Sequence, residues 1–482
     1  MTQVSKSVSR FSLIEWAILA VLFILYFALF TSYSFNPFQK EDLDLVFNDM
    51  ILRLSRGDFT IDPKIILAEA YVRDGRTYAY FGVTPAVARL AFLPFIDLRT
   101  TSVSAIICTL LAFAISVLNY VSMSTAAGFP KSSFLRNCFF LTFLFSGLPL
   151  YLAGSHAIYI EVTLWALFFA AMFIYSYVRY RSSGHKLKAY LISMAVCAGL
   201  CLNTRVTTGA MLSAAWVVVF LHGLSREPWR GRWPNRLMSK AEIYAGLALS
   251  AFTLLALYVN YERWGNPLEF ADITRQIYQQ HMHPERAVIL HRYGAFNFIR
   301  APFGVQYYFF PVWGLWGSDH VSILNSFMQT YMHGAEFPPA SLVLTDALLV
   351  WLAGLYLVKA SRGLAQRLTD RRPIRASADL IVWACFAPIP VLMLSHIYMA
   401  LRYRIEFFPF IFFGAWLAVR NFGSEAFWRR HRNLVLGLTL LSIAASLVTL
   451  RISRMPPGST VNMNLPAEYM TVLRAQSRPV SD

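Results

Sequence analysis

The sequence contains few charged residues for its length. Only 14% of its 482 residues are charged and 57% are hydrophobic, whereas about a quarter of the residues in soluble proteins are charged. This excludes an ordinary soluble globular protein. Acidic residues are the scarcer kind, which leaves a net charge of +17. The basic residues are scattered between apolar runs, so this charge does not indicate nucleic-acid binding.

Cysteines, repeats and metal motifs are also scarce. The cysteines all lie in apolar stretches and are Cys108, Cys138, Cys197, Cys201 and Cys385. None has CxxC spacing, so neither a disulfide framework nor a zinc site is indicated, and we expect small core residues. His281-Met-His283 is a weak cation motif, and we predict no metal site there. The absence of an internal repeat argues against a transporter built from matching halves.

Long apolar runs are what the sequence has in abundance. A helix needs about 20 mostly apolar residues to cross a bilayer. We therefore predict an all-α polytopic protein with about eleven transmembrane helices in a single membrane domain, residues 1–482. The expected spans are 13–33, 100–123, 137–153, 159–178, 189–202, 203–222, 241–260, 341–358, 379–398, 405–420 and 433–450. The run 189–222 is divided at Asn203-Thr204-Arg205, because a polar turn suits two short helices.

The charges predict how these spans are oriented. With the N-terminus inside, the six cytoplasmic tracts carry 23 of the 43 Lys and Arg residues but only three of the 26 acids. Basic inner loops are what the positive-inside rule predicts. Residues 34–99, 261–340 and the tail 451–482 then lie outside. Within the first of these, the apolar segment 81–97 is short and interrupted by prolines, so we expect an interfacial helix on the outer face.

The two large outer regions are expected to carry the function. The first, 34–99, has acids just after the first span, and these either balance nearby Lys and Arg or include a general base or a cation ligand over a lipid phosphate. The second, 261–340, is rich in tryptophan and tyrosine. Its rings either form an interfacial belt or line a groove for a sugar or an isoprenoid chain.

Several charged residues lie where apolar surroundings make them costly. Glu161 begins the fourth span shortly after His156, and Arg205 lies at the turn between the fifth and sixth. Arg402 and Arg404 lie between the ninth and tenth spans. Such residues often mark a substrate path, and arginines suit paired phosphate oxygens. The alternative is internal pairing, for instance of Arg404 with the acid at position 406.

Four motifs resemble the GT-C class of membrane glycosyltransferases, in the expected order. An acid at Asp42 precedes Gly57-Asp58-Phe59 by fifteen residues, as in the lipid A aminoarabinose transferase and protein O-mannosyltransferases. The others are Tyr80-Phe81 ahead of Pro85, Leu202-Asn203-Thr204-Arg205, and Arg402-Tyr403-Arg404 ahead of Pro409. One departure is Leu43, where the mannosyltransferases have a second acid; here that acid is displaced to Asp44.

The resemblance implies a sugar transfer from a polyprenyl-phosphate donor to a glycan or lipid acceptor, with inversion. It implies Asp42 or Asp44 as the base and Arg205, Arg402 and Arg404 as ligands of the donor phosphate. The residues implied in binding the sugar or acceptor are Tyr80, His156, Glu161 and Tyr403. No cofactor is required, although a divalent cation is compatible. We expect the bacterial inner membrane, with the active site facing the periplasm.

Two other functions remain open on the sequence. An O-antigen polymerase or ligase would use a diphosphate-linked donor and place its key arginines and histidines in the late outer loop, where this chain has Arg275, Arg286 and Arg292. A transporter or lipid flippase would have ionisable groups near the membrane midplane. In the predicted topology they gather instead at the outer face.

Overall fold

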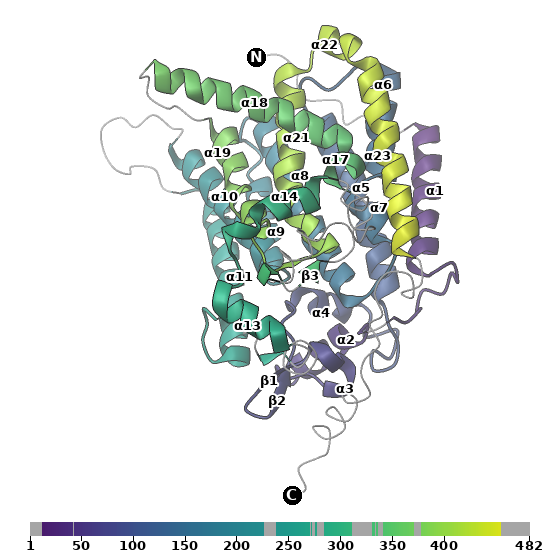
Figure 1. The fold of residues 1–482 in the computed structure, drawn as a ribbon, viewed down its shortest axis with the longest axis vertical. Coiled ribbons are helices and arrows are strands. Elements are labelled where there is room, and N and C mark those ends of the chain that lie inside the picture. Colours follow the sequence, from purple (N-terminus) through teal and green to yellow (C-terminus); the bar gives the residue numbers. More distant parts are fainter. Residues whose placement is uncertain are drawn as a thin grey trace, which may run out of the picture.

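The described part of the protein is mainly helical. The computed structural model describes residues 12–41, 43–225, 238–269, 271, 275–276, 284–310, 330–332, 334–335, 341–370 and 377–454. Helices dominate these residues and the strands are short (Figure 1). The predicted all-α class is confirmed. Asp42 and the predicted outer tail beyond Arg454 lie outside the described residues.

Nine helical stretches among the described residues are long and apolar enough to cross a membrane. They are α1 (Leu13–Phe30), α5 (Ser104–Ser124), α6 with α7 (Ser133–Phe145, Leu148–Leu152), α8 (Ile158–Ser182), α10 (Val206–Ser225), α11 (Lys240–Trp264), α18 (Ala347–Thr369), η5 with α21 (Leu401–Phe407, Phe408–Phe422) and α23 (Arg432–Ser453). Shorter apolar helices are α9 (Ala189–Leu202) and α19 with α20 (Ala378–Cys385, Pro388–Met393). Each predicted span therefore corresponds to an apolar helix, and the protein is integral to a membrane.

The predicted division of the run 189–222 is also confirmed. Helix α9 ends at Leu202 and α10 begins at Val206. Asn203 in the turn donates its side-chain amide to the carbonyl oxygens of Gly199 and Phe252, at 3.0 and 2.8 Å. The Asn203 side chain therefore binds the last turn of α9 to the middle of α11.

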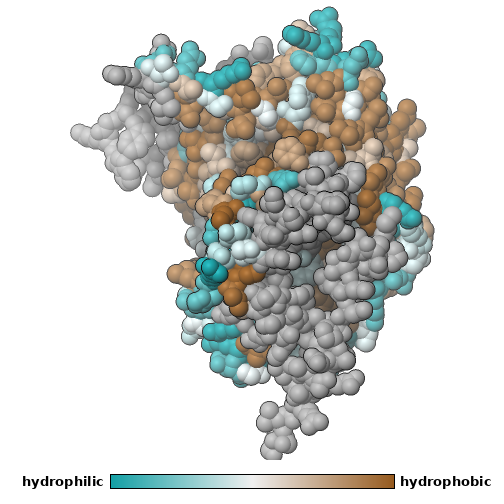
Figure 2. Space-filling model, viewed as in Figure 1, coloured by the Kyte–Doolittle hydropathy of each residue, from teal (hydrophilic) through white to brown (hydrophobic). Residues whose placement is uncertain are grey.

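Helix α8 runs through the middle of the bundle. It packs against α5 on one side and α9 on another, and α9 in turn packs against α10 and α11. Helix α18 packs against α21, and α23 against α6. Hydrophobic side chains form a broad belt over this bundle, with hydrophilic ones at its upper rim and near its lower end (Figure 2).

Short elements gather at the lower end of the bundle in Figure 1, which we call the first-loop end. They are α2 (Val46–Leu54), α3 (Pro63–Ile66), η1 (Leu67–Glu69), the antiparallel strands β1 (Tyr71–Arg73) and β2 (Arg76–Tyr78), α4 (Thr84–Ala88) and η2 (Arg89–Ala91). The segment 81–97 thus forms short helices and no membrane-length one, as expected from its prolines.

The remaining elements come mainly from the second long region and its surroundings. They are α13 (Pro284–Tyr293), η4 (Phe298–Arg300), α14 (Ala301–Phe309), β3 (Gly334–Ala335), α17 (Leu342–Thr345), β4 (Tyr398–Met399), which pairs in parallel with β3, and α22 (Glu425–Arg430). All five cysteines are free; four are buried and Cys385 is half-buried, as expected for core residues.

One close approach joins two of the sequence motifs. A side chain at Gly82 would collide with the backbone carbonyl of Asn203. The backbone N–H of Thr84, two residues after Gly82, donates to the same carbonyl oxygen at 3.1 Å. The segment that follows Tyr80-Phe81 is therefore packed directly onto the turn that carries Arg205, and glycine is what permits it.

Candidate active site

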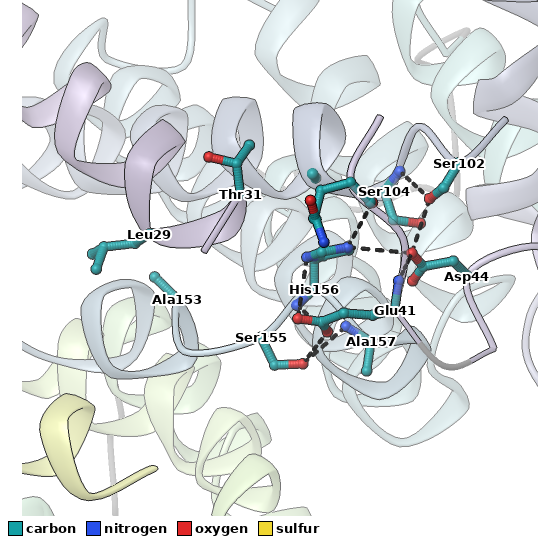
Figure 3. Close-up of polar contacts among 12 residues, drawn as sticks. Leu29, Thr31, Glu41, Asp44, Ser102, Ser104, Ala153, Ser155, His156 and Ala157 are labelled. Carbon is teal, nitrogen blue, oxygen red and sulfur yellow. Dashed lines mark hydrogen bonds and ion pairs between the residues drawn. The ribbon is translucent and has the colours of Figure 1, made fainter. Parts of the chain in front are cut away.

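Glu41, Asp44 and His156 form a compact group at the first-loop end, which we call the histidine cluster (Figure 3). Asp44 Oδ2 lies 3.2 Å from His156 Nε2, and Glu41 Oε1 lies 3.4 Å from His156 Nδ1. Glu41 Oε2 accepts hydrogen bonds from the Ser155 hydroxyl at 2.5 Å and from the His156 backbone N–H at 2.9 Å. Asp44 Oδ2 also accepts from the Ser102 hydroxyl at 3.0 Å.

Burial separates the members of the histidine cluster. The His156 side chain is 0% exposed and that of Asp44 is 1% exposed, whereas that of Glu41 is 25% exposed. Both predicted site residues of this group are thus enclosed by protein. A base must reach the proton that it removes, so the position of Asp44 argues against a direct role in proton transfer.

The environment raises the pKa of both enclosed groups. Burial raises the pKa of Asp44 by more than its bonds with His156, Glu41 and Ser102 lower it. Burial by itself lowers the pKa of His156, but the hydrogen bond and charge of Asp44 and the charge of Glu41 outweigh it, so that the pKa is raised. The imidazole therefore stays protonated to higher pH than an exposed histidine would, between two acids.

Glu161 is bound to Arg89 in a second group directly beside the first. The Arg89 guanidinium donates to both Glu161 carboxylate oxygens, at 2.7 and 2.8 Å, and both side chains are 0% exposed. Its remaining N–H groups donate to Asn48 Oδ1, the Ser104 hydroxyl and a backbone carbonyl. The Ser104 hydroxyl also donates to Glu161. Every polar atom of this pair is thus satisfied by protein.

Arg205 and Glu406 form a further pair, and Tyr403 lies over it. Arg205 Nε donates to Glu406 Oε1 at 2.6 Å, and the guanidinium lies 5.3 Å from the centre of the Tyr403 ring. Two threonines of α10, Thr207 and Thr208, complete the hydrogen bonding of Glu406. The internal pairing considered for residue 406 is therefore present, with Arg205 as a partner.

Arg402 extends this group towards α8. Its guanidinium lies 4.4 Å from the ring centre of Tyr159 and 5.4 Å from that of Tyr403. We call Arg205, Arg402, Tyr403, Tyr159 and Glu406 the arginine cluster. Two of the three predicted phosphate ligands are therefore neighbours in the fold.

Tyr80 adjoins the arginine cluster from the first loop. Burial, together with the charge of Glu69, raises the pKa of Tyr80 well above its ordinary value, and the charge of Arg402 acts in the opposite direction. Glu69 itself accepts a hydrogen bond from Gln276 at 2.6 Å. The first loop thus contributes an aromatic ring and a carboxylate beside Arg402.

Arg404, the third predicted phosphate ligand, lies in a different environment. It is 0% exposed, and its guanidinium lies 5.8 Å from the ring centre of Tyr151 in α7. It points to another helix than Arg402 does, although only one residue separates them.

The start of α8 brings the clusters together. His156 precedes the helix, Tyr159 lies in its first turn under Arg402, and Glu161 follows on the same turn with Arg89. Ser102 and Ser104, just before and at the start of α5, connect Asp44 with Glu161. First-loop and late residues separated by hundreds of positions therefore meet at one helix end.

No group of three metal-ligating side chains suited to a metal ion occurs within the described ranges. Glu41, Asp44 and His156 are close but already bind one another. The absence of a required metal stays a prediction, because Asp42 lies outside those ranges.

Glu41 was among the first-loop acids considered from the sequence, but it was not assigned to the site. Sequence reasoning missed Glu69, Arg89 and Tyr159, which also contribute to these groups. Arg89 had a usable signal, because a charge inside the apolar segment 81–97 requires a partner. Glu69 and Tyr159 had none, because their neighbours come from distant parts of the chain.

Comparison with known proteins finds likeness only in three-dimensional structure. No family model and no curated protein matches the sequence. Among solved structures, the oligosaccharyltransferase of Archaeoglobus fulgidus in its apo form is similar, with a TM-score of 0.44 and 13% identity, over 91% of this chain and 55% of that one. The enzyme named AglB from the same organism, in complex with an inhibitory peptide and a dolichol-phosphate, gives 0.40 and 13%, over 92% and 56%. These enzymes are GT-C membrane glycosyltransferases, and this chain spans little more than half of their length.

Proposed function

We propose that this protein is a membrane glycosyltransferase that takes a sugar from a polyprenyl-phosphate donor. The observation that carries the proposal is the meeting of Arg205, Arg402 and Tyr403 with Tyr159 and the first loop at the start of α8. Guanidinium groups bind pairs of phosphate oxygens. Flat aromatic faces beside them offer a surface for a sugar ring or a lipid chain.

The chemistry needs little more than these groups. The acceptor hydroxyl oxygen attacks the anomeric carbon while the bond from that carbon to the phosphate oxygen breaks. The electron pair leaves with the polyprenyl phosphate, whose added charge Arg205 and Arg402 stabilise. The hydroxyl proton passes to a carboxylate, and attack opposite the leaving group inverts the configuration.

We assign the base to Asp42 rather than Asp44. Asp44 is enclosed and bound to His156 and Ser102, which supports a role in holding the loop. Tyr80 and Tyr403 orient the sugar in this proposal. Glu161 is bound to Arg89 and serves the fold, and Arg404 supports α7 through Tyr151.

The membrane setting of the reaction follows from the charges. The first-loop end lies on the outer side, because the basic tracts between spans belong to the cytoplasmic side under the positive-inside rule. We place the protein in the bacterial inner membrane, with a glycan or lipid as acceptor. The reaction requires no cofactor, and a divalent cation is compatible with it.

Substitution of the proposed base tests this function. Purified Asp42→Asn protein in nanodiscs should lose sugar transfer from a synthetic polyprenyl-phosphate hexose by about a hundredfold or more, since general-base catalysis contributes roughly 10²–10⁴-fold. Asp97→Asn is the matched control, because Asp97 is exposed and its side chain bonds to nearby loop residues. Full activity of Asp42→Asn, with normal folding, would refute the assignment.

The donor distinguishes the rival functions in the same assay. Turnover of a diphosphate-linked donor but not of the monophosphate would favour the polymerase or ligase type. Movement of an intact polyprenyl-phosphate sugar between leaflets, without cleavage, would favour a flippase.

A further inference from the structure

The residues on both sides of position 42 are bound to one buried histidine. His156 uses its backbone N–H for Glu41 Oε2 at 2.9 Å. Its Nδ1 faces Glu41 Oε1 at 3.4 Å, and its Nε2 faces Asp44 Oδ2 at 3.2 Å. Nε2 also lies 3.0 Å from the carbonyl oxygen of Gln39. The backbone N–H and both ring nitrogens of His156 thus face residues 39–44 (Figure 3).

The loop is also bonded to itself within this short stretch. The Glu41 N–H donates to Asp44 Oδ2 at 2.6 Å, and the Asp44 N–H lies 3.4 Å from the Glu41 carbonyl oxygen. Ser102 binds Asp44 from the start of α5, and Ser155 binds Glu41 from the segment before α8. The two acids therefore tie the loop to two different parts of the bundle.

We propose that His156 is a positioning residue that fastens the first loop to the start of α8 through Glu41 and Asp44, and so sets the place of the acid between them. This rests on the proposed function, in which Asp42 is the base. His156 then acts on catalysis without touching substrate. The His156 side chain is 0% exposed, so it does not contact the sugar or the acceptor.

The charge on the imidazole gives this clamp a pH dependence. Among the described residues, the charged groups that face His156 are Asp44 and Glu41 of the first loop. The Arg89–Glu161 pair is linked to Asp44 through Ser102 and Ser104 and is neutral overall. Since the pKa of His156 is raised, its charged form is favoured in the folded protein, and the clamp weakens as pH rises through that pKa. The pKa of Asp44 is raised as well, so its protonated form is also favoured in the folded protein, and this shift adds to the weakening of the clamp as pH rises.

Hydrogen exchange of the full-length protein in nanodiscs tests the clamp without any substrate. The amides of Glu41, Asp44 and His156 should be protected at neutral pH and lose protection, after correction for the intrinsic rate, as pH rises. In His156→Gln the protection of these amides should be roughly tenfold lower at neutral pH, the expected effect of losing a hydrogen bond to a charged group. The further loss of protection as pH rises should disappear in this variant. His431→Gln, at the other end of the bundle, is the matched control.

Steady-state transfer with a polyprenyl-phosphate hexose supplies the second measurement. His156→Gln should lower kcat roughly tenfold with an unchanged KM for the donor, and the alkaline fall of kcat should vanish. A raised KM with unchanged loop protection would make His156 a substrate ligand and overturn the proposal. Unchanged protection together with an unchanged kcat would also overturn it.

If His156→Gln does not fold, Asp44→Asn is the second variant. It should lower loop protection and shift the loss of protection at alkaline pH to lower pH. An unchanged pH dependence would overturn the proposal. If His156→Gln lowers loop protection but the unsubstituted protein shows no transferase activity, the clamp is supported and the proposed function is refuted.

Discussion

Two arginine–glutamate pairs contribute to the groups of the candidate active site, and they differ in burial and in completeness. In the pair of Arg89 and Glu161, all three guanidinium nitrogens and both carboxylate oxygens are hydrogen-bonded to protein. In the pair of Arg205 and Glu406, the carboxylate is complete, but among the described residues only Nε of the guanidinium donates a hydrogen bond, to Glu406. The Arg205 side chain is 17% exposed, whereas that of Arg89 is 0% exposed.

The difference distinguishes a guanidinium group that only stabilises the fold from one that can also bind a ligand. A buried guanidinium whose donors are all used can only hold the helices around it. A guanidinium with remaining donors, flanked by Tyr403 and Arg402, can receive an anionic ligand without breaking its own pair. Hydrogen-bond saturation of the guanidinium therefore distinguishes the two pairs.

Removal of one partner from the complete pair should have the largest effect. Arg89→Leu leaves Glu161 buried without compensation, and removing one member of a buried pair costs about 3–5 kcal/mol. The expected result is a large fall in the thermal unfolding midpoint of the purified protein. Arg89→Leu/Glu161→Leu, which removes both charges, should recover much of the loss. An unfolding midpoint unchanged by Arg89→Leu would show that the pair does not carry the fold.

A matched pair of lysine substitutions should have effects of intermediate size and should compare the two arginines directly. Lysine keeps the charge but loses the fork that binds two oxygens. Arg205→Lys should raise the KM for the lipid donor about tenfold, which corresponds to about 1.4 kcal/mol, with little change in unfolding. Arg89→Lys should lower the unfolding midpoint and leave the KM unchanged. Initial rates over a range of donor concentrations and thermal unfolding measure both, and exchanged outcomes would reverse the assignment of the two pairs.

The smallest expected effect concerns the ring beneath Arg402. Tyr159→Leu removes a cation–π contact at 4.4 Å, a contact type worth about 0.5–1 kcal/mol when partly exposed. Donor affinity should therefore fall about two- to fivefold, while Tyr159→Phe, which keeps the ring, should bind normally. Equal loss in the two variants would assign the effect to the phenol group instead.

The spans could be predicted because hydropathy is local. Each of the expected segments is an apolar helix, and the break after Leu202 was readable from three polar residues in one run. The interruption of the segment 81–97 was readable from Pro85 and Pro94, which oppose a continuous helix. These predictions needed no knowledge of which helices are neighbours.

The partners of the charged residues could not be predicted in the same way. Glu406 was considered beside Arg404 because they are only two positions apart in sequence, yet Arg205, some two hundred positions away, binds it. Glu161 was expected at a sugar and lies instead against Arg89. Of three arginines expected at a phosphate, two share the arginine cluster and Arg404 lies against Tyr151.

The sequence by itself determined that this chain enters a membrane, where it crosses, and which residues carry charge at the boundary. Burial of an apolar run depends on its own composition, so that information is present in every segment. The tertiary structure alone decided which of those charges are neutralised and which remain available. That choice depends on distances between segments far apart in the chain. At the start of α8 it encloses His156 and Glu161, whereas among the described residues only Nε of the Arg205 guanidinium donates a hydrogen bond.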